Sequence, residues 1–241
     1  FIGIGGIGMS WMAELLYKLG FKISGSDQVE SDRTASLSKL GIRIIIGHNL
    51  KNIEKSDVVV YSSAISKSNP EIKGAIKLKI PVIRRAEMLA ELIKLKKTSI
   101  AIAGTHGKTT TASMLGSILT VSKSEPTMVI GGIVNKFQSN SISGNGDIIV
   151  VEADEFDRSF LTLQPTMGVI TNLDLEHLDC YENLEDLKNA FKQFANAVPF
   201  YGKVVVGLDN NNAGSIIKKI NRPVITFGLN EKSQVKAENL I

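Results

Sequence analysis

The chain of 241 residues has one cysteine, no long apolar run and only a small excess of positive charge. A single cysteine, Cys180, cannot form an intramolecular disulfide and fits a reducing compartment, so we expect a cytoplasmic protein. No apolar run approaches the roughly 18 residues of a membrane-spanning helix, which argues against a membrane protein. The net charge of +4 comes without a dense Lys/Arg stripe with interleaved aromatics. We therefore expect no nucleic-acid partner.

The composition, with 43% hydrophobic and 22% charged residues, is that of a globular protein. The length allows one large domain or two ordinary ones. The sequence begins at Phe1, inside an apparent strand and without an initiator methionine, so we expect it to be part of a longer protein.

Short β-rich runs alternate with helical patterns along the whole chain, which predicts an α/β fold with parallel sheets and crossover helices. Two glycine-rich turns, at 3–8 and 104–107, each follow a predicted strand and precede a predicted helix. We expect a Rossmann-like domain over 1–96 and a P-loop-type α/β domain over 97–241. The predicted strands are 1–4, 22–26, 42–46, 57–62, 81–83, 100–103, 127–130, 148–152, 167–171, 204–207 and 224–227. The predicted helices are 9–19, 34–40, 70–77, 86–95, 111–119 and 184–195, with loops at 137–146 and in the tail 230–241.

The second glycine turn has the layout of a phosphate-binding loop, in the short form Gly-x-x-Gly-Lys-Thr. Glycines let backbone N–H groups approach phosphate oxygens, and the next helix directs its positive end at the same anion. Lys108 is expected to reach the β- and γ-phosphates and Thr109 to ligate Mg²⁺. The candidate nucleotide-binding residues are Gly104, Thr105, His106, Gly107, Lys108, Thr109 and Thr110.

The first glycine turn, from Gly3 to Gly8, fits the pattern Gly-x-Gly-x-x-Gly, and Asp27 follows its last glycine by 19 residues. This arrangement is typical of a pyrophosphate on a helix N-terminus and an acid on a ribose hydroxyl. The pattern indicates a diphosphate ligand but does not separate NAD, FAD and a UDP-sugar.

Acidic and histidine side chains follow two later strands. Glu152 ends the strand 148–152, where a carboxylate beside a phosphate loop can hold Mg²⁺. For Asp154, Glu155 and Asp157 a solvated acidic turn is the favoured interpretation. His177, at the end of the next strand, suits a second divalent ion or a substrate carboxylate equally with a structural role. His48 is placed in a surface loop without a role.

Taken together, these motifs resemble the N-terminal and central domains of the Mur ligase family, in family order over nearly the whole chain. The motifs are Gly3–Ser10, Ser24–Asp27, Ser62–Ser66, Asn69–Glu71, Pro81–Leu89, Ala103–Thr111, Glu152–Glu155, Thr171–Asn172 and Pro199–Gly202. The resemblance implies that the first domain binds UDP-N-acetylmuramate and not a dinucleotide. The residues so implied are Gly5, Gly6, Gly8 and Met9 in the glycine turn, with Asp27 and Ser62 near the nucleoside.

For the second domain the resemblance implies ATP with Mg²⁺, or Mn²⁺ in its place. Lys108 contacts the phosphates, Thr109 and Glu152 hold one ion, and His177 with Glu152 holds a second near the muramyl carboxylate. Lys108, Glu152 and His177 are thus the expected catalytic residues, and Asn172 lies near that carboxylate or its metal. Glu176 departs from the aspartate that usually precedes this histidine.

The implied activity joins L-alanine to the muramyl carboxylate through an acyl phosphate, in peptidoglycan precursor synthesis. The resemblance implies that catalysis requires the family's C-terminal ligase domain, which we expect to lie outside these 241 residues, so we expect these residues alone to be inactive. Three alternatives stay open: a ligase that recycles a murein tripeptide, an NAD-dependent oxidoreductase built on the first glycine turn, and a non-catalytic nucleotide-gated binding protein.

Overall fold

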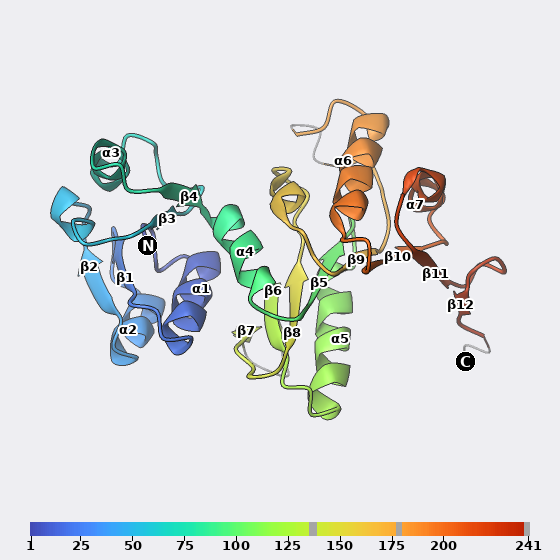
Figure 1. Ribbon diagram of the computed structural model, residues 1–241, viewed down its shortest axis with the longest axis horizontal. Helices are drawn as coiled ribbons and strands as arrows, with labels where there is room; N and C mark the ends of the chain where they lie inside the picture. Colours follow the sequence, from blue (N-terminus) through green and yellow to red (C-terminus); the bar gives the residue numbers. More distant parts are fainter. Residues whose placement is uncertain (135–138, 177–179, 239–241) are drawn as a thin grey trace. The chain divides into compact units, whose positions relative to one another are not determined.

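The computed structural model describes residues 1–134, 139–176 and 180–238 (Figure 1). The chain divides into two compact units, Phe1–Leu89 and Ala90–Ile241. The division falls within helix α4 (Arg85–Lys94). The domain boundary near Lys96 stays a prediction.

The first unit is a parallel α/β unit. Its helices are α1 (Ile7–Lys18), α2 (Asp32–Lys39) and α3 (Pro70–Lys77), and its strands are β1 (Ser24–Asp27), β2 (Arg43–Ile46), β3 (Val59–Tyr61) and β4 (Val82–Arg84). Strands β1 and β2 pair in parallel, and so do β3 and β4. Ile2 makes parallel bridges to both Ser26 and Tyr61, so it lies between the two pairs. The strand expected at 1–4 is limited to these bridges, because Gly3 turns the chain at a φ of +76°.

Local sequence signals explain where the helices of this unit begin. Ser31 and Thr34 form a reciprocal capping box at the start of α2. Helix α3 begins at Pro70, whose missing N–H costs nothing in the first turn, and the Asn69 side chain accepts a hydrogen bond from the Glu71 N–H. The expected helix 70–77 is confirmed at both ends.

The second unit is built on an eight-stranded sheet in the order β12-β11-β10-β9-β5-β8-β6-β7. Every pair in it is parallel except β6 with β7. The strands are β5 (Thr98–Ala103), β6 (Thr127–Val134), β7 (Ser139–Ile142), β8 (Ile148–Glu152), β9 (Met167–Ile170), β10 (Lys203–Gly207), β11 (Val224–Gly228) and β12 (Val235–Lys236). The helices are α5 (Lys108–Val121), α6 (Leu184–Ala197) and α7 (Asn211–Ile216). β5 thus lies inside the sheet, flanked by β8 and β9.

The elements β7, α7 and β12 of the second unit differ from the sequence expectation. The loop predicted at 137–146 contains strand β7, which pairs with β6 through main-chain hydrogen bonds. The sequence of β7 is mostly polar, so it lacks the alternation of apolar and polar residues that would have predicted a strand. Helix α7 is a short turn capped by Asn210, and β12 has two residues in the predicted tail. These elements are too short for hydrophobic periodicity to reveal them.

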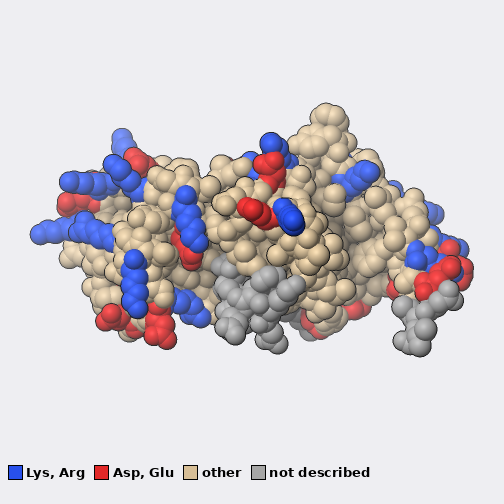
Figure 2. Space-filling model, turned by 90° about the horizontal axis from the view of Figure 1, so that it is seen from below, with Lys and Arg blue, Asp and Glu red and all other residues tan. Residues whose placement is uncertain are grey.

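The surface carries charges of both signs. On the face in Figure 2, Lys and Arg side chains are interspersed with Asp and Glu. None of the described helices is long and apolar enough to cross a bilayer.

A buried carboxylate connects β1 with the segment that follows β2 in the first unit. Glu71 is fully buried, and its Oε2 accepts hydrogen bonds from Ser26 Oγ at 2.6 Å and lies 3.1 Å from His48 Nδ1. Its Oε1 accepts from the Asn52 side chain at 2.5 Å. His48, placed by the sequence in a surface loop, has a side chain only 9% exposed and is part of this network.

We expect Glu71→Ala to destabilise the first unit by about 3 kcal/mol, because it leaves several buried polar groups without their acceptor. Urea unfolding followed by the fluorescence of Trp11, the single tryptophan, measures this, since Trp11 is buried in the same unit. The control is Glu54→Ala, which removes an exposed carboxylate. Equal stability of the two variants would contradict the role of this network.

Candidate nucleotide-binding sites

The phosphate loop occupies the turn between β5 and α5. Gly104 and Gly107 have φ values of +141° and +78°, a region that favours glycine. A Cβ at Gly104 would lie 1.9 Å from Thr171 Oγ1, so this position also lacks room for a side chain. Gly107 is the N-cap of α5 and offers no side chain to the first amides of the helix. These N–H groups and the helix dipole form an anion-binding site.

Lys108 turns its ammonium back into this loop. Nζ donates to the Gly104 carbonyl at 2.6 Å and contacts the Thr105 carbonyl at 3.2 Å. It also pairs with both carboxylate oxygens of Glu155, at 2.9 and 2.7 Å. The side chain of Lys108 is 17% exposed, so the ammonium lies at the boundary between the loop and solvent.

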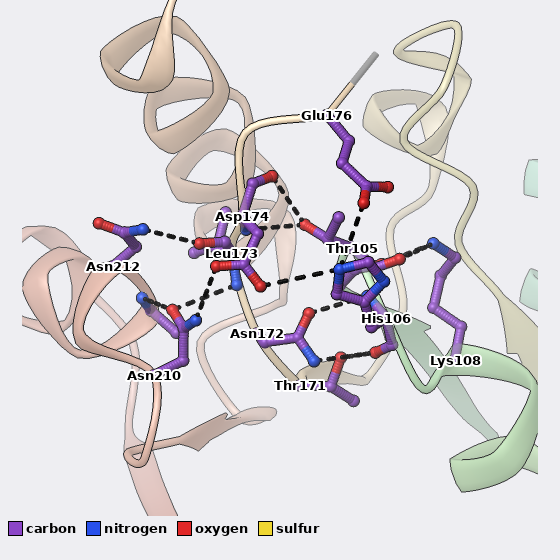
Figure 3. Close-up of polar contacts among 12 residues, drawn as sticks. Thr105, His106, Lys108, Thr171, Asn172, Leu173, Asp174, Glu176, Asn210 and Asn212 are labelled. Atoms are coloured by element: carbon purple, nitrogen blue, oxygen red, sulfur yellow. Dashed lines mark hydrogen bonds and ion pairs between the residues drawn. The ribbon is translucent and has the colours of Figure 1, made fainter.

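Residues directly after strand β9 form hydrogen bonds with the main chain of the phosphate loop (Figure 3). Asn172 Oδ1 accepts from the His106 N–H at 2.8 Å, and its Nδ2 donates to the His106 carbonyl at 3.0 Å. Thr171 Oγ1 donates to the same carbonyl at 2.7 Å. The Asn172 amide, expected near the substrate carboxylate, is thus placed on the main chain of the phosphate loop.

A second layer of contacts joins the loop to the residues after β9. The Asp174 N–H donates to Thr105 Oγ1 at 2.9 Å, and that hydroxyl donates to the Asp174 carbonyl at 3.1 Å. The His106 ring lies outside, with Nε2 3.3 Å from Glu176 Oε1 and 3.8 Å from Asp174 Oδ2. The Glu176 carboxylate thus lies against the histidine of the phosphate loop.

Oxygen donors suited to Mg²⁺ lie on both sides of the loop. Glu152 is the last residue of β8 and stands in register with Ile102 on β5, two residues before the loop. Thr109 is exposed on the first turn of α5. Carboxylate and hydroxyl oxygens are ligands that Mg²⁺ accepts. His177 lies outside the described residues, and within them no group of three or more His, Cys, Asp and Glu side chains is arranged to hold a metal.

Glu155 contradicts the interpretation of the acidic turn as solvated. Asp154 and Asp157 are exposed as expected, but Glu155 is 1% exposed and pairs with Lys108. Because Glu155 stands among other acidic residues in the sequence, the sequence did not distinguish it from the exposed ones. Its position could have indicated a role near the loop, because Glu155 closely follows the end of β8, and β8 pairs with the β5 strand that leads into the phosphate loop.

The segment around Glu155 is anchored to the start of α6. The Tyr181 hydroxyl donates to the Glu155 carbonyl at 2.6 Å. Burial raises the pKa of this hydroxyl, so it stays a donor. The Arg158 guanidinium lies 4.7 Å from the centre of the Tyr181 ring and pairs with Asp186 in the first turn of α6.

The glycine turn of the first unit forms a second candidate anion site. Asp27, at the end of β1, accepts from the Gly5 N–H at 2.8 Å and from the Gln28 N–H at 2.8 Å. Gly6 is the N-cap of α1 and leaves the first amides of that helix without a side-chain cap. A Cβ at Gly5 would lie 2.9 Å from Thr34 and 3.0 Å from Asp27, so this glycine allows the close approach of both.

Arg85 is the cation beside this turn, and sequence reasoning did not assign it a role. A Cβ at Gly8 would lie 2.9 Å from Arg85 Nη1, so the guanidinium lies directly against this glycine. Two residues expected to contact the substrate differ in their exposure to solvent. Ser62 is half-buried directly after β3, whereas the Met9 side chain is 1% exposed and belongs to the core. Arg85 opens helix α4 in the linear sequence, far from Gly8, and no local pattern connects the two.

Comparisons with known proteins agree with this arrangement of two units. A model of the Mur ligase family catalytic domain matches residues 1–97, and a model of the Mur ligase middle domain matches residues 102–241. The chain is 52% identical over 240 residues to UDP-N-acetylmuramate–L-alanine ligase of Aquifex aeolicus and 51% identical to that of Syntrophus aciditrophicus. Each alignment covers all of this chain but 53% and 50% of the relative, so the chain spans about half the length of the curated relatives it matches.

Solved structures show the same fold. The UDP-N-acetylmuramate:L-alanyl-gamma-D-glutamyl-meso-diaminopimelate ligase of Neisseria meningitides superimposes with a TM-score of 0.82 at 28% identity, covering 94% of this chain and 76% of that one. The UDP-N-acetylmuramate-alanine ligase of Thermotoga maritima has a TM-score of 0.77 at 33% identity, covering 95% and 51%. With both family models matched in order along 1–97 and 102–241, the chain belongs to the Mur ligase family.

Proposed function

We propose that this chain forms the substrate- and ATP-binding part of a ligase that joins L-alanine to the muramyl carboxylate of UDP-N-acetylmuramate. The observation that carries the proposal is the phosphate loop 104–109, with its two left-handed glycines, its lysine and an adjoining strand that ends in Glu152. The names of the 50%-identical relatives support the choice of substrates. We expect the protein to act in the cytoplasm.

In this proposal the second unit binds ATP. The first amides of α5 and the Lys108 ammonium bind the phosphates, and the hydrogen bonds from Thr171 and Asn172 keep the loop in shape. Thr109 and Glu152, with His177, are the residues that would hold Mg²⁺. When bound, this ion offsets the negative charge of the triphosphate.

The first unit binds UDP-N-acetylmuramate at its glycine turn. The Gly8 amide at the start of α1 and the Arg85 guanidinium receive the diphosphate, because both provide positive electrostatic potential there, whereas the Gly6 N–H donates to the Gly3 carbonyl at 3.1 Å within the turn. Asp27 and Ser62 stand at the carboxyl ends of β1 and β3, where ligands of such sheets bind.

The chemistry is the activation of a carboxylate. A muramyl carboxylate oxygen attacks the γ-phosphorus, the bond to the ADP oxygen breaks, and an acyl phosphate forms. The amine of L-alanine then attacks the carbonyl carbon, phosphate leaves, and the amine gives up a proton. A carboxylate at neutral pH is a poor acyl donor, so phosphorylation supplies the leaving group. Lys108 stabilises the charge on the transferred phosphoryl group.

Release of ADP from the full-length protein with UDP-N-acetylmuramate tests the proposal when L-alanine, L-serine, glycine and the murein tripeptide are offered in turn. We expect turnover with L-alanine. The similarity to the Neisseria enzyme makes the tripeptide the second candidate, and turnover with it alone would favour recycling. Binding of NADH in a fluorescence titration would instead favour an oxidoreductase. A failure to turn over ATP with any acceptor would favour a non-catalytic nucleotide-binding protein.

We expect Lys108→Ala in the full-length protein to lower ADP release at least about a hundredfold, because it removes a charged group that binds the transferred phosphoryl. The matched control is Lys203→Ala, an exposed lysine on β10. Circular dichroism should show both variants folded. Wild-type turnover in Lys108→Ala would exclude the loop as the ATP site.

We expect Arg85→Ala to weaken UDP-N-acetylmuramate binding about tenfold, through loss of a charge-assisted contact to the diphosphate, without changing ATP affinity. Isothermal titration with each ligand measures both. Arg33→Ala, an exposed arginine on α2, is the control. An Arg85→Ala variant that binds the sugar nucleotide like the control would place the guanidinium outside the site.

A further inference from the structure

The Lys108 ammonium is already saturated with acceptors in this structure. Four oxygen atoms surround Nζ: the carbonyls of Gly104 and Thr105, and both carboxylate oxygens of Glu155. An ammonium has three N–H donors, so these contacts use all of them. A phosphate oxygen can bind Lys108 only by replacing one of the present acceptors.

Glu155 is the strongest of these acceptors, because it carries a full negative charge and contacts Nζ through both oxygens. It is also fixed in place. The side chain is 1% exposed, and its backbone carbonyl accepts hydrogen bonds from the Tyr181 hydroxyl at 2.6 Å and from the Arg158 N–H at 3.1 Å. These bonds hold the Glu155 backbone beside the loop, and the carboxylate itself is buried against Lys108.

The geometry points to Glu155 as a positioning residue that competes with the nucleotide for Lys108. This inference rests on the proposed function, since it requires the loop to bind ATP. The carboxylate holds the ammonium within the loop and supplies its counter-charge. When a triphosphate binds, its oxygens replace some of the contacts between Glu155 and the Lys108 ammonium. When ADP leaves, these contacts form again, so the partly buried ammonium always has an anionic partner.

Two consequences follow for the nucleotide. A fixed buried carboxylate beside the phosphates repels them, so Glu155 weakens the binding of both ATP and ADP. It also assists the departure of ADP, because the competing anion is already in place. A residue that served only the fold would do neither.

The test is Glu155→Gln, which keeps the shape of the side chain and removes its charge. Titration calorimetry with MgATP and with MgADP on the full-length protein is expected to show about tenfold tighter binding of both, the size of one additional like-charge repulsion near a surface. Stopped-flow release of a fluorescent ADP analogue is expected to slow by a similar factor. The control is Asp154→Asn, which neutralises the adjacent, exposed carboxylate and keeps an oxygen that can accept from the Phe156 N–H.

Glu155→Gln binding at wild-type strength or more weakly would overturn the inference, and so would an equal gain in Asp154→Asn. Thermal melting shows whether each variant folds. If Glu155→Gln does not fold, Glu155→Asp replaces it: a shorter carboxylate loosens the contact, two- to threefold tighter binding is expected, and an unchanged affinity overturns the inference. Wild-type protein that binds no ATP, or Lys108→Ala that binds it normally, would instead refute the proposed function itself.

Discussion

The hydrogen bonds from the end of β9 to the phosphate loop are the contacts on which the proposed ATP site depends. Because β5 and β9 are paired in parallel with Ala103 opposite Ile170, the next residues along each strand, Gly104 and Thr171, must meet. Thr171 and Asn172 then bind the His106 main chain, and Gly104 has no side chain to obstruct them. The strand register thus fixes a loop whose glycines would otherwise leave it free to change conformation.

Both candidate anion sites contain a resident carboxylate. In the second unit Glu155 forms an ion pair with the Lys108 ammonium, and in the first unit Asp27 accepts a hydrogen bond from the Gly5 N–H. Donor groups arranged for an anion repel one another and lose hydration when nothing pairs with them, so an internal acceptor stabilises the fold. The cost is competition with the ligand, which makes the affinity of such a site a balance between internal and external anions.

The sequence predicted most of the helices and strands, but it did not predict most of the contacts between side chains at the two candidate sites. Glycine turns between apolar runs and helical patterns predicted the parallel strands, and the helical pattern that starts at Pro70 predicted α3 to the residue. The roles of Glu155 and Arg85 depend on contacts with residues 47 and 77 positions away along the chain, which no local pattern encodes. His48 was also misplaced, because its burial depends on Glu71, a charged residue whose own burial is exceptional.

Within the described residues, strands β7 and β12 lie at the two sides of the large sheet, and both are short. The first has four residues, Ser-Asn-Ser-Ile, and the second only two, Val235 and Lys236. Such short strands at the sides of a sheet give little continuous main chain for a strand of another molecule to pair with. The reversed direction of β7 also ends the parallel ladder. The four-residue length of β7 thus limits the main chain that is open to such pairing on that side of the sheet.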